Sequence, residues 1–254
     1  MSRDLTITTV GHVAVAEIRR PPANYFDHGL IADLVVSAKD LQARGTRAII
    51  LCSEGKHFCA GANFSEGGME ADRARSSELL YREAVRLFDV KVPIIAAVQG
   101  SAVGGGLGLA CAADFRVATP SSRFHANFSI LGFHQGFGLS ETLPAIVGAQ
   151  RAMDLLYTSR RINGQCAFDI GLVDRLVPDG ELRAEALHWA AEIASAAPLA
   201  VQSIRETLRA PLARRVHAVL KRELDQQQQL WATKDSKIGI AANLARDTAV
   251  FTGE

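Results

Sequence analysis

The sequence has no long hydrophobic run, no excess of either charge and few cysteines, and each shortage excludes a class of protein. Glycine interrupts the apolar segment at residues 93–103 well short of the roughly 20 residues that span a bilayer. The 28 basic and 27 acidic residues leave a net charge of +1, so no basic surface for nucleic acid or an anionic membrane is expected. The first ten residues lack the basic and apolar stretches of a secretory signal. We therefore expect a soluble, cytoplasmic protein with no nucleic-acid or membrane partner.

The cysteines argue against disulfides and against a metal site. The four residues Cys52, Cys59, Cys111 and Cys166 form no Cys-x-x-Cys pair, and two of them lie within apolar runs. Buried free thiols in a reducing compartment are the simplest interpretation. No cluster of histidine, cysteine and carboxylate residues has metal-ligand spacing, so no metal is expected. Cys59, which stands among glycines, remains a minor candidate for reactivity.

Hydrophobic patterning predicts an α/β core followed by a helical C-terminal region. Short apolar or alternating runs alternate with helical patterns, which is typical of right-handed crossovers between parallel strands. Strands are predicted at residues 5–10, 12–18, 47–52, 93–98, 114–118 and 123–126, and helices at 27–43, 71–90, 107–113, 212–231 and 237–246. We place the α/β core at residues 1–198 and the helical region at residues 199–254.

Two glycine-rich loops follow predicted buried strands. Residues 55–63 (GKHFCAGAN) follow the strand at 47–52, and residues 104–108 (GGGLG) follow the strand at 93–98. Neither loop carries the spacing of a phosphate-binding motif. Glycine loops in this position can present two convergent backbone N–H groups to a developing oxyanion, because no Cβ blocks the ligand. Tight packing of helix against strand explains the glycines equally well.

Three longer segments resemble the enoyl-CoA hydratase/isomerase (crotonase) family, and they are HFCAGAN, VPIIAAVQGSAVGGGLGLACAADFRVA and AVFTG. The resemblance extends in order over essentially all 254 residues. It implies an acyl-CoA enzyme built as a spiral of β-β-α units, with a helical C-terminal region at a trimer interface. It also implies a homotrimer or a dimer of trimers, and no cofactor beyond the coenzyme A of the substrate.

The resemblance further assigns roles to individual residues. The two backbone donors to the thioester carbonyl fall on Ala62 and Gly105. Substrate contacts are expected from the same loops and from both ends of the chain, namely Ala23, Ala60, Gly61, Gly104 and Phe251.

The sequence departs from the family where a hydratase needs its two glutamates. By position these residues are Gly108, which follows the triple glycine after one spacer, and Phe128, four residues before Gly132. Asn63 also replaces the usual aspartate after the first loop. Because neither glycine nor phenylalanine transfers protons, we expect weak hydration of crotonyl-CoA. Phe128 is instead expected to contact the substrate.

Three side chains are candidates to replace the missing glutamates. His134 lies in a loop near the second empty position and titrates near neutral pH, although it is equally consistent with a surface histidine. Glu141 lies early in the following helix, where an acid also suits the helix dipole. Tyr81 is a candidate hydrogen-bond donor, with an ordinary buried aromatic as the alternative.

Several functions remain open. Double-bond isomerisation needs one acid/base group and an enolate-stabilising hole, so it survives the loss of the glutamates better than hydration. Hydrolysis or decarboxylation of a CoA thioester uses the same hole. A non-catalytic acyl-CoA-binding protein is the alternative from another class.

Overall fold

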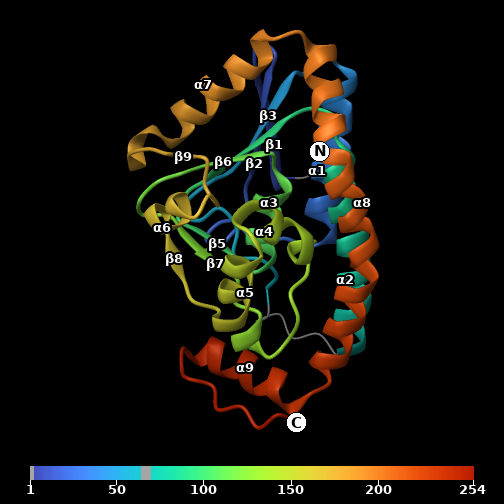
Figure 1. Ribbon diagram of the computed structural model, residues 1–254, viewed down its shortest axis with the longest axis vertical. Coiled ribbons are helices and arrows are strands. Elements are labelled where there is room, and N and C mark those ends of the chain that lie inside the picture. The colour runs from blue at the N-terminus through green and yellow to red at the C-terminus, as the bar shows by residue number, and fades with distance from the viewer. Residues whose placement is uncertain (1–2, 64–69) are drawn as a thin grey trace.

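A six-stranded sheet in the order β1-β2-β3-β4-β6-β9 forms the centre of the molecule, as a computed structural model of the chain shows (Figure 1). The structure describes residues 3–63 and 70–254, without the side chains of 70–74. The strands are β1 (Leu5–Val10), β2 (Val13–Ile18), β3 (Ala48–Ser53), β4 (Ile94–Val98), β5 (Ser101–Val103), β6 (Phe115–Ala118), β7 (Arg123–His125), β8 (Ile162–Asn163) and β9 (Arg175–Leu176). The helices are α1 (His28–Ala43), α2 (Glu70–Val85), α3 (Gly105–Ala112), α4 (Leu139–Val147), α5 (Ala149–Thr158), α6 (Gly164–Asp169), α7 (Leu182–Ser195), α8 (Pro198–Trp231) and α9 (Lys234–Ala245).

The sheet has the arrangement that the hydrophobic pattern predicts. β1 and β2 form an antiparallel hairpin around Gly11, and β2, β3, β4, β6 and β9 then pair in parallel. Every residue of β3 and β4 is buried, because helices cover both faces of the sheet. α7 packs on one face through Leu182, Ala186 and Ala190. α1, capped by the Asp27 side chain, contributes its apolar residues to the larger core cluster.

A second sheet, in the order β5-β7-β8, was not predicted as a separate unit. The chain reaches it by a sharp bend after β4 at Gly100, whose φ is +56°. A Cβ at this position would lie 1.9 Å from the carbonyl oxygen of Lys56, so only glycine fits. The bend places β5 beside the first glycine loop, where Cys59 pairs in parallel with Ala102.

The C-terminal region is a long helix, a short helix and a tail. α8 begins at Pro198, earlier than the predicted start at residue 212, and it packs against α2 and α4. α9 lies across the lower end of the molecule and contacts the turn at Ser129–Leu131 (Figure 1). Asp235 holds the tail by accepting hydrogen bonds from the backbone amides of Thr252 (2.7 Å) and Gly253 (2.9 Å). Residues 199–254 therefore pack against the α/β core over much of their length.

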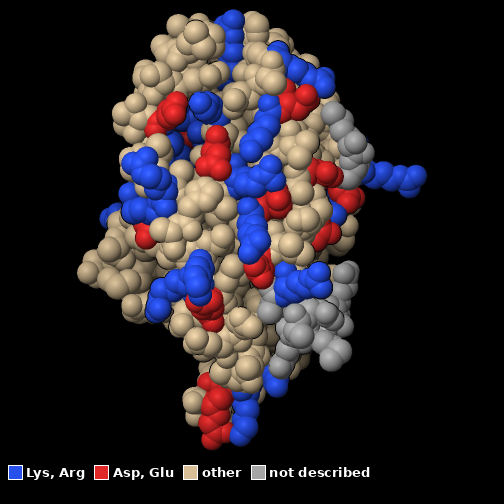
Figure 2. Space-filling model, turned by 90° about the vertical axis from the view of Figure 1, so that its right-hand side faces the viewer, with Lys and Arg blue, Asp and Glu red and all other residues tan. Residues whose placement is uncertain are grey.

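Charge of both signs is distributed over the surface. Figure 2 shows lysine and arginine interspersed with aspartate and glutamate on one side of the molecule. No helix in the described part of the chain combines the length and the apolar character needed to cross a membrane.

Candidate active site

Both glycine loops open into one cavity of about 310 Å³. Its walls come from the segment before and at the start of α1, from α2, from the residues that follow β7, and from the end of α8. The lining residues are Phe26, Asp27, His28, Ala60, Gly61, Ala62, Asn63, Ser76, Ser77, Leu80, Tyr81, Gly104, Gly105, Asn127, Phe128, Leu131, Phe133, Gln227 and Trp231. The sequence-predicted residues Ala60, Gly61, Ala62, Gly104 and Gly105 are therefore brought together at one site.

The two loops approach each other through backbone contacts. The Cys59 amide donates to Ser101 O and the Val103 amide donates to Cys59 O, both at 3.0 Å. Gly61 has a φ of +82°, and a Cβ there would lie 2.9 Å from Val103 O and 3.4 Å from Gly105 N. Glycine at position 61 thus allows the first loop to lie directly against the start of α3.

Two backbone amides at this junction are available to a ligand. Gly105 is the first residue of α3, where amides have no partner within the helix and the helix dipole is positive. Among the described residues, no acceptor is recorded for the N–H groups of Ala62 and Gly105. Two such donors on one cavity can polarise a carbonyl oxygen and stabilise the negative charge that develops on it.

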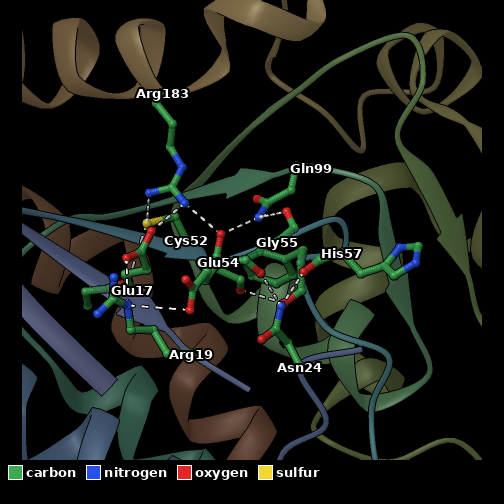
Figure 3. Close-up of polar contacts among 12 residues, drawn as sticks. Glu17, Arg19, Asn24, Cys52, Glu54, Gly55, His57, Gln99 and Arg183 are labelled. Carbon is green, nitrogen blue, oxygen red and sulfur yellow. Dashed lines mark hydrogen bonds and ion pairs between the residues drawn. The ribbon is translucent and has the colours of Figure 1, made fainter. Parts of the chain in front are cut away.

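Asn24 holds the first glycine loop, residues 55–63, through hydrogen bonds to its backbone and to Glu54 just before it (Figure 3). Its fully buried side chain donates to the carbonyl oxygens of Glu54 (2.8 Å) and His57 (2.6 Å). The neighbouring Ala23 carbonyl accepts from the Ala60 amide at 3.0 Å. Ala23 does not line the cavity, and its contact with Ala60 positions the loop.

The arginines near the loop are held by carboxylates. Arg19 forms ion pairs with Glu17 and Glu54 (Figure 3). Arg20 forms ion pairs with Asp4 (2.8 Å) and Asp27 (2.9 Å). Both side chains therefore stabilise the local structure.

Phenylalanine side chains occupy the space near Gly108 and at position 128, the two positions where the resemblance implies glutamates in a hydratase. A Cβ on Gly108 would lie 2.6 Å from the Cβ of Phe137, which is buried and packs 5.4 Å from the ring of Phe26. Phe128, a predicted substrate contact, lines the cavity, and its ring lies edge-on to Phe133 at 6.1 Å. This wall is aromatic and supplies no carboxylate at either position.

Other predicted residues lie elsewhere. His134 bonds through Nδ1 to Gln135 O (2.7 Å), and Glu141 pairs with Arg215 at 2.9 Å. Phe251 is 41% exposed on the C-terminal tail. Among the described residues, the cavity wall includes none of these three. Cys59 is fully buried, and burial raises the pKa of its thiol to about 12, so its thiolate is scarce near neutral pH.

Tyr81 is the predicted candidate that does reach the cavity. Its hydroxyl accepts a hydrogen bond from Gln227 Nε2 at 3.0 Å. Burial raises the pKa of Tyr81 well above its usual value, so the phenol keeps its proton.

Sequence reasoning missed several lining residues, among them Asp27, His28, Gln227 and Trp231. Burial alone would raise the pKa of Asp27, but hydrogen bonds from Arg20 and the Leu30 amide hold it below its usual value. Gln227 and Trp231 arrive on α8, far along the chain. Their four-residue spacing on one helix face was the only available signal. Within the described ranges, no group of histidine, cysteine and carboxylate residues is arranged to hold a metal ion.

Comparison with known proteins agrees with this architecture. The sequence model of the enoyl-CoA hydratase/isomerase family matches residues 8–254. A crotonyl-CoA hydratase from Syntrophomonas wolfei is 34% identical over 94% of both chains, and a short-chain-enoyl-CoA hydratase from Clostridium acetobutylicum is 31% identical over 91% of both. A crystal structure of enoyl-CoA hydratase/isomerase from Pseudoalteromonas atlantica superposes with a TM-score of 0.87 at 28% identity, covering 98% of this chain and 100% of that one.

The fold is therefore the crotonase fold, as the sequence predicted. The chain belongs to the enoyl-CoA hydratase/isomerase family, and it is an enzyme of that family.

Proposed function

We propose that the protein acts on acyl-CoA thioesters, holding the thioester carbonyl with the backbone N–H groups of Ala62 and Gly105 and stabilising an enolate. The observation that supports this most directly is the close contact between the two loops. A Cβ built on Gly61 would lie only 3.4 Å from the backbone nitrogen of Gly105, at the start of α3. Removing one donor from comparable sites lowers the rate by roughly 10²–10³-fold. The same geometry in this chain suits any reaction that passes through a thioester enolate.

Ordinary hydration is expected to be weak. Hydration needs groups that position water and transfer protons, whereas Phe128 and its neighbours Leu131 and Phe133 make this wall of the cavity apolar. The ionisable side chains on the described part of the cavity wall are Asp27, His28 and Tyr81. Asp27 and His28 lie together at the start of α1. One of them is the expected proton acceptor for isomerisation of a double bond next to the α carbon.

Decarboxylation of a CoA thioester is the second candidate. It produces the same enolate and requires no base, and an aromatic wall disfavours a substrate carboxylate that remains charged.

A panel of CoA thioesters tests the proposal. Purified protein in D₂O is expected to exchange the α protons of butyryl-CoA, measured by mass spectrometry, and to isomerise 3-hexenoyl-CoA. Hydration of crotonyl-CoA, followed by loss of its ultraviolet absorbance, is expected to remain far slower. Crotonyl-CoA hydration at the rate of an ordinary hydratase would contradict the expected weak hydration. Binding of every thioester without exchange or turnover would instead indicate a binding protein.

A further inference from the structure

His28 is the first residue of α1, and it lies on the cavity wall. The residue is exposed, so its imidazole is accessible to a ligand in the cavity. Among the described residues, no hydrogen bond or ion pair is recorded for this ring. A neutral imidazole carries one donor and one acceptor nitrogen, and both are therefore available here.

Asp27, the neighbouring ionisable residue, has both carboxylate oxygens engaged. Its Oδ1 caps α1 by accepting a hydrogen bond from the Leu30 amide at 2.9 Å. Its Oδ2 pairs with Arg20 Nη1, also at 2.9 Å. A proton taken up by this carboxylate would weaken the ion pair and the cap, so the contacts favour a structural role for Asp27.

Tyr81, the third ionisable residue on the described part of the wall, is not suited to accept a proton. Burial raises the pKa of its phenol well above the usual value, so the hydroxyl stays protonated near neutral pH. Its oxygen also accepts a hydrogen bond from Gln227 Nε2 at 3.0 Å. Of the three ionisable side chains, His28 is the one with an unengaged acceptor atom.

The segment that leads into α1 places His28 near the two backbone donors. The Phe26 amide donates to Gly61 O at 3.0 Å, directly before Ala62. The Phe26 ring lies against Gly105, where an added Cβ would collide with Phe26 Cζ. Phe26 thus contacts both loops, and two residues of chain span at most about 7 Å. The first residue of α1 therefore lies beside the junction of the two loops.

We propose that His28 is the proton acceptor for the reacting thioester. Its unprotonated ring nitrogen takes a proton from the α carbon: the C–H bond breaks, an N–H bond forms, and the electron pair moves into the carbonyl group. The amides of Ala62 and Gly105 hold the resulting enolate oxygen. With a 3-enoyl ester, the imidazolium returns the proton to the γ carbon, which gives the 2-enoyl ester and restores the neutral ring. This proposal rests on the proposed function, since it names the residue that performs the proton transfer.

Exchange of α protons tests the proposal on the full-length protein. His28→Ala is expected to slow the exchange of butyryl-CoA in D₂O by about 10²–10⁴-fold, measured by mass spectrometry. His188→Ala is the matched control, because His188 is exposed on α7 and lies outside the cavity. Equal exchange in His28→Ala and the wild type would overturn the proposal and leave the proposed function standing. Absence of exchange in the wild type would overturn both.

Added imidazole separates a catalytic role of His28 from a structural one. In His28→Ala, imidazole is expected to raise the exchange rate in proportion to its concentration, because a free base can enter the space that the side chain leaves. The His188→Ala variant and the wild type are expected to show no such increase. A loss of exchange that imidazole does not restore would assign His28 a structural role and overturn the proposal.

Asp27→Asn discriminates between the two neighbours at the start of α1. Asparagine also caps helices, so this variant removes the carboxylate while α1 still begins at His28. It is expected to lose less exchange activity than His28→Ala, because the imidazole remains. A larger loss in Asp27→Asn than in His28→Ala would overturn the proposal in favour of Asp27.

Discussion

At the scale of single residues, the site depends on two glycines, because a larger residue at either position would collide with a neighbouring part of the chain. Gly61 and Gly108 both stand where an added methyl group would meet another part of the chain, the backbone of β5 in one case and Phe137 in the other. One glycine lets the two loops meet, and the other accommodates an aromatic ring. Substitution by alanine therefore tests each contact with the smallest possible change.

Gly61→Ala is expected to lower kcat/KM on an active thioester by about 10²–10³-fold, because the new Cβ displaces the loop that carries the Ala62 amide. Gly45→Ala is the control, since Gly45 has a similar φ of +85° and nothing within 4 Å of its Cβ. Both variants bear the cost of a left-handed alanine, about 1–2 kcal/mol. Equal activity in the two variants, measured by steady-state kinetics, would argue against the proposed role of the Ala62 amide.

Gly108→Ala is expected to lower the free energy of unfolding by about 1–3 kcal/mol, because its Cβ would lie 2.6 Å from that of Phe137. The same change inside a helix normally stabilises by about 1 kcal/mol. Combining it with Phe137→Gly should recover at least about 1 kcal/mol of the loss in a double-mutant cycle measured by urea unfolding. Strict additivity would mean that Phe137 does not fill this space.

At the scale of elements, α8 connects the core to the cavity. Near its start, Arg205 and Arg209 reach the buried Asp114, which also accepts a hydrogen bond from the Ile94 amide at the start of β4. Further along, Glu223 accepts hydrogen bonds from the amides of Gly138 and Ser140, at the start of α4. The helix ends with Gln227 and Trp231, which line the cavity.

Asp114→Asn is expected to destabilise the protein by about 3–5 kcal/mol, because it leaves two largely buried arginines without their carboxylate. Asp225→Asn, on α8, breaks only an exposed pair with Lys221 and should cost less than about 0.5 kcal/mol. Urea unfolding of both variants measures the difference. Similar losses would show that Asp114 contributes no more than a surface pair.

Glu223 predicts a dependence of stability on pH. It is fully buried, and desolvation raises its pKa above the ordinary value of 4.5. The folded state therefore retains the proton longer than the unfolded state. The stabilisation is complete below about pH 4.5 and decreases as the pH rises through the pKa of the folded protein. Relative to Glu223→Gln, the wild type should lose stability between pH 4.5 and neutral pH, measured by urea midpoints. Parallel pH curves would contradict this.

The elements also show how far sequence reasoning reaches. The β1–β2 hairpin, the parallel strands β3, β4 and β6, and α1 with its Asp27 cap are confirmed, because period and capping are local properties. The two glycine loops were correctly placed at one site. Gln227, Trp231 and the position of Phe137 were missed, because they depend on how α8 and the turn before α4 pack in three dimensions. α8 was predicted too short: it begins at Pro198 rather than at residue 212, and it continues through Pro211.

At the scale of the whole molecule, an apolar groove of about 480 Å³ lies between α8, the end of α7 and the starts of β4 and β6. Its rim includes Ile204 and Leu208, which are 59% and 72% exposed, and Leu199 on the same helix is 78% exposed. Large exposed side chains at helical spacing are typical of interaction surfaces. This is consistent with the oligomer that the resemblance implied.

Light scattering is expected to give three or six times the chain mass of 27.3 kDa. Leu208→Asp should lower the oligomer mass, because it places a charge in the groove. Val36→Asp, at an exposed position on α1, should leave the mass unchanged. A monomer in the wild type, or no effect of Leu208→Asp, would contradict the assignment of this surface.

The amides of Ala62 and Gly105 also have a consequence for how such a protein changes over evolutionary time. A group that belongs to the main chain is encoded by the path of the backbone, so it persists through most substitutions that alter only side chains. At the two positions where the resemblance implies the glutamates of a hydratase, this chain carries Gly108 and Phe128, while the two loops still meet at Gly61. Under the proposed function, the backbone groups that hold the carbonyl and the side chains that transfer protons can therefore change independently of each other.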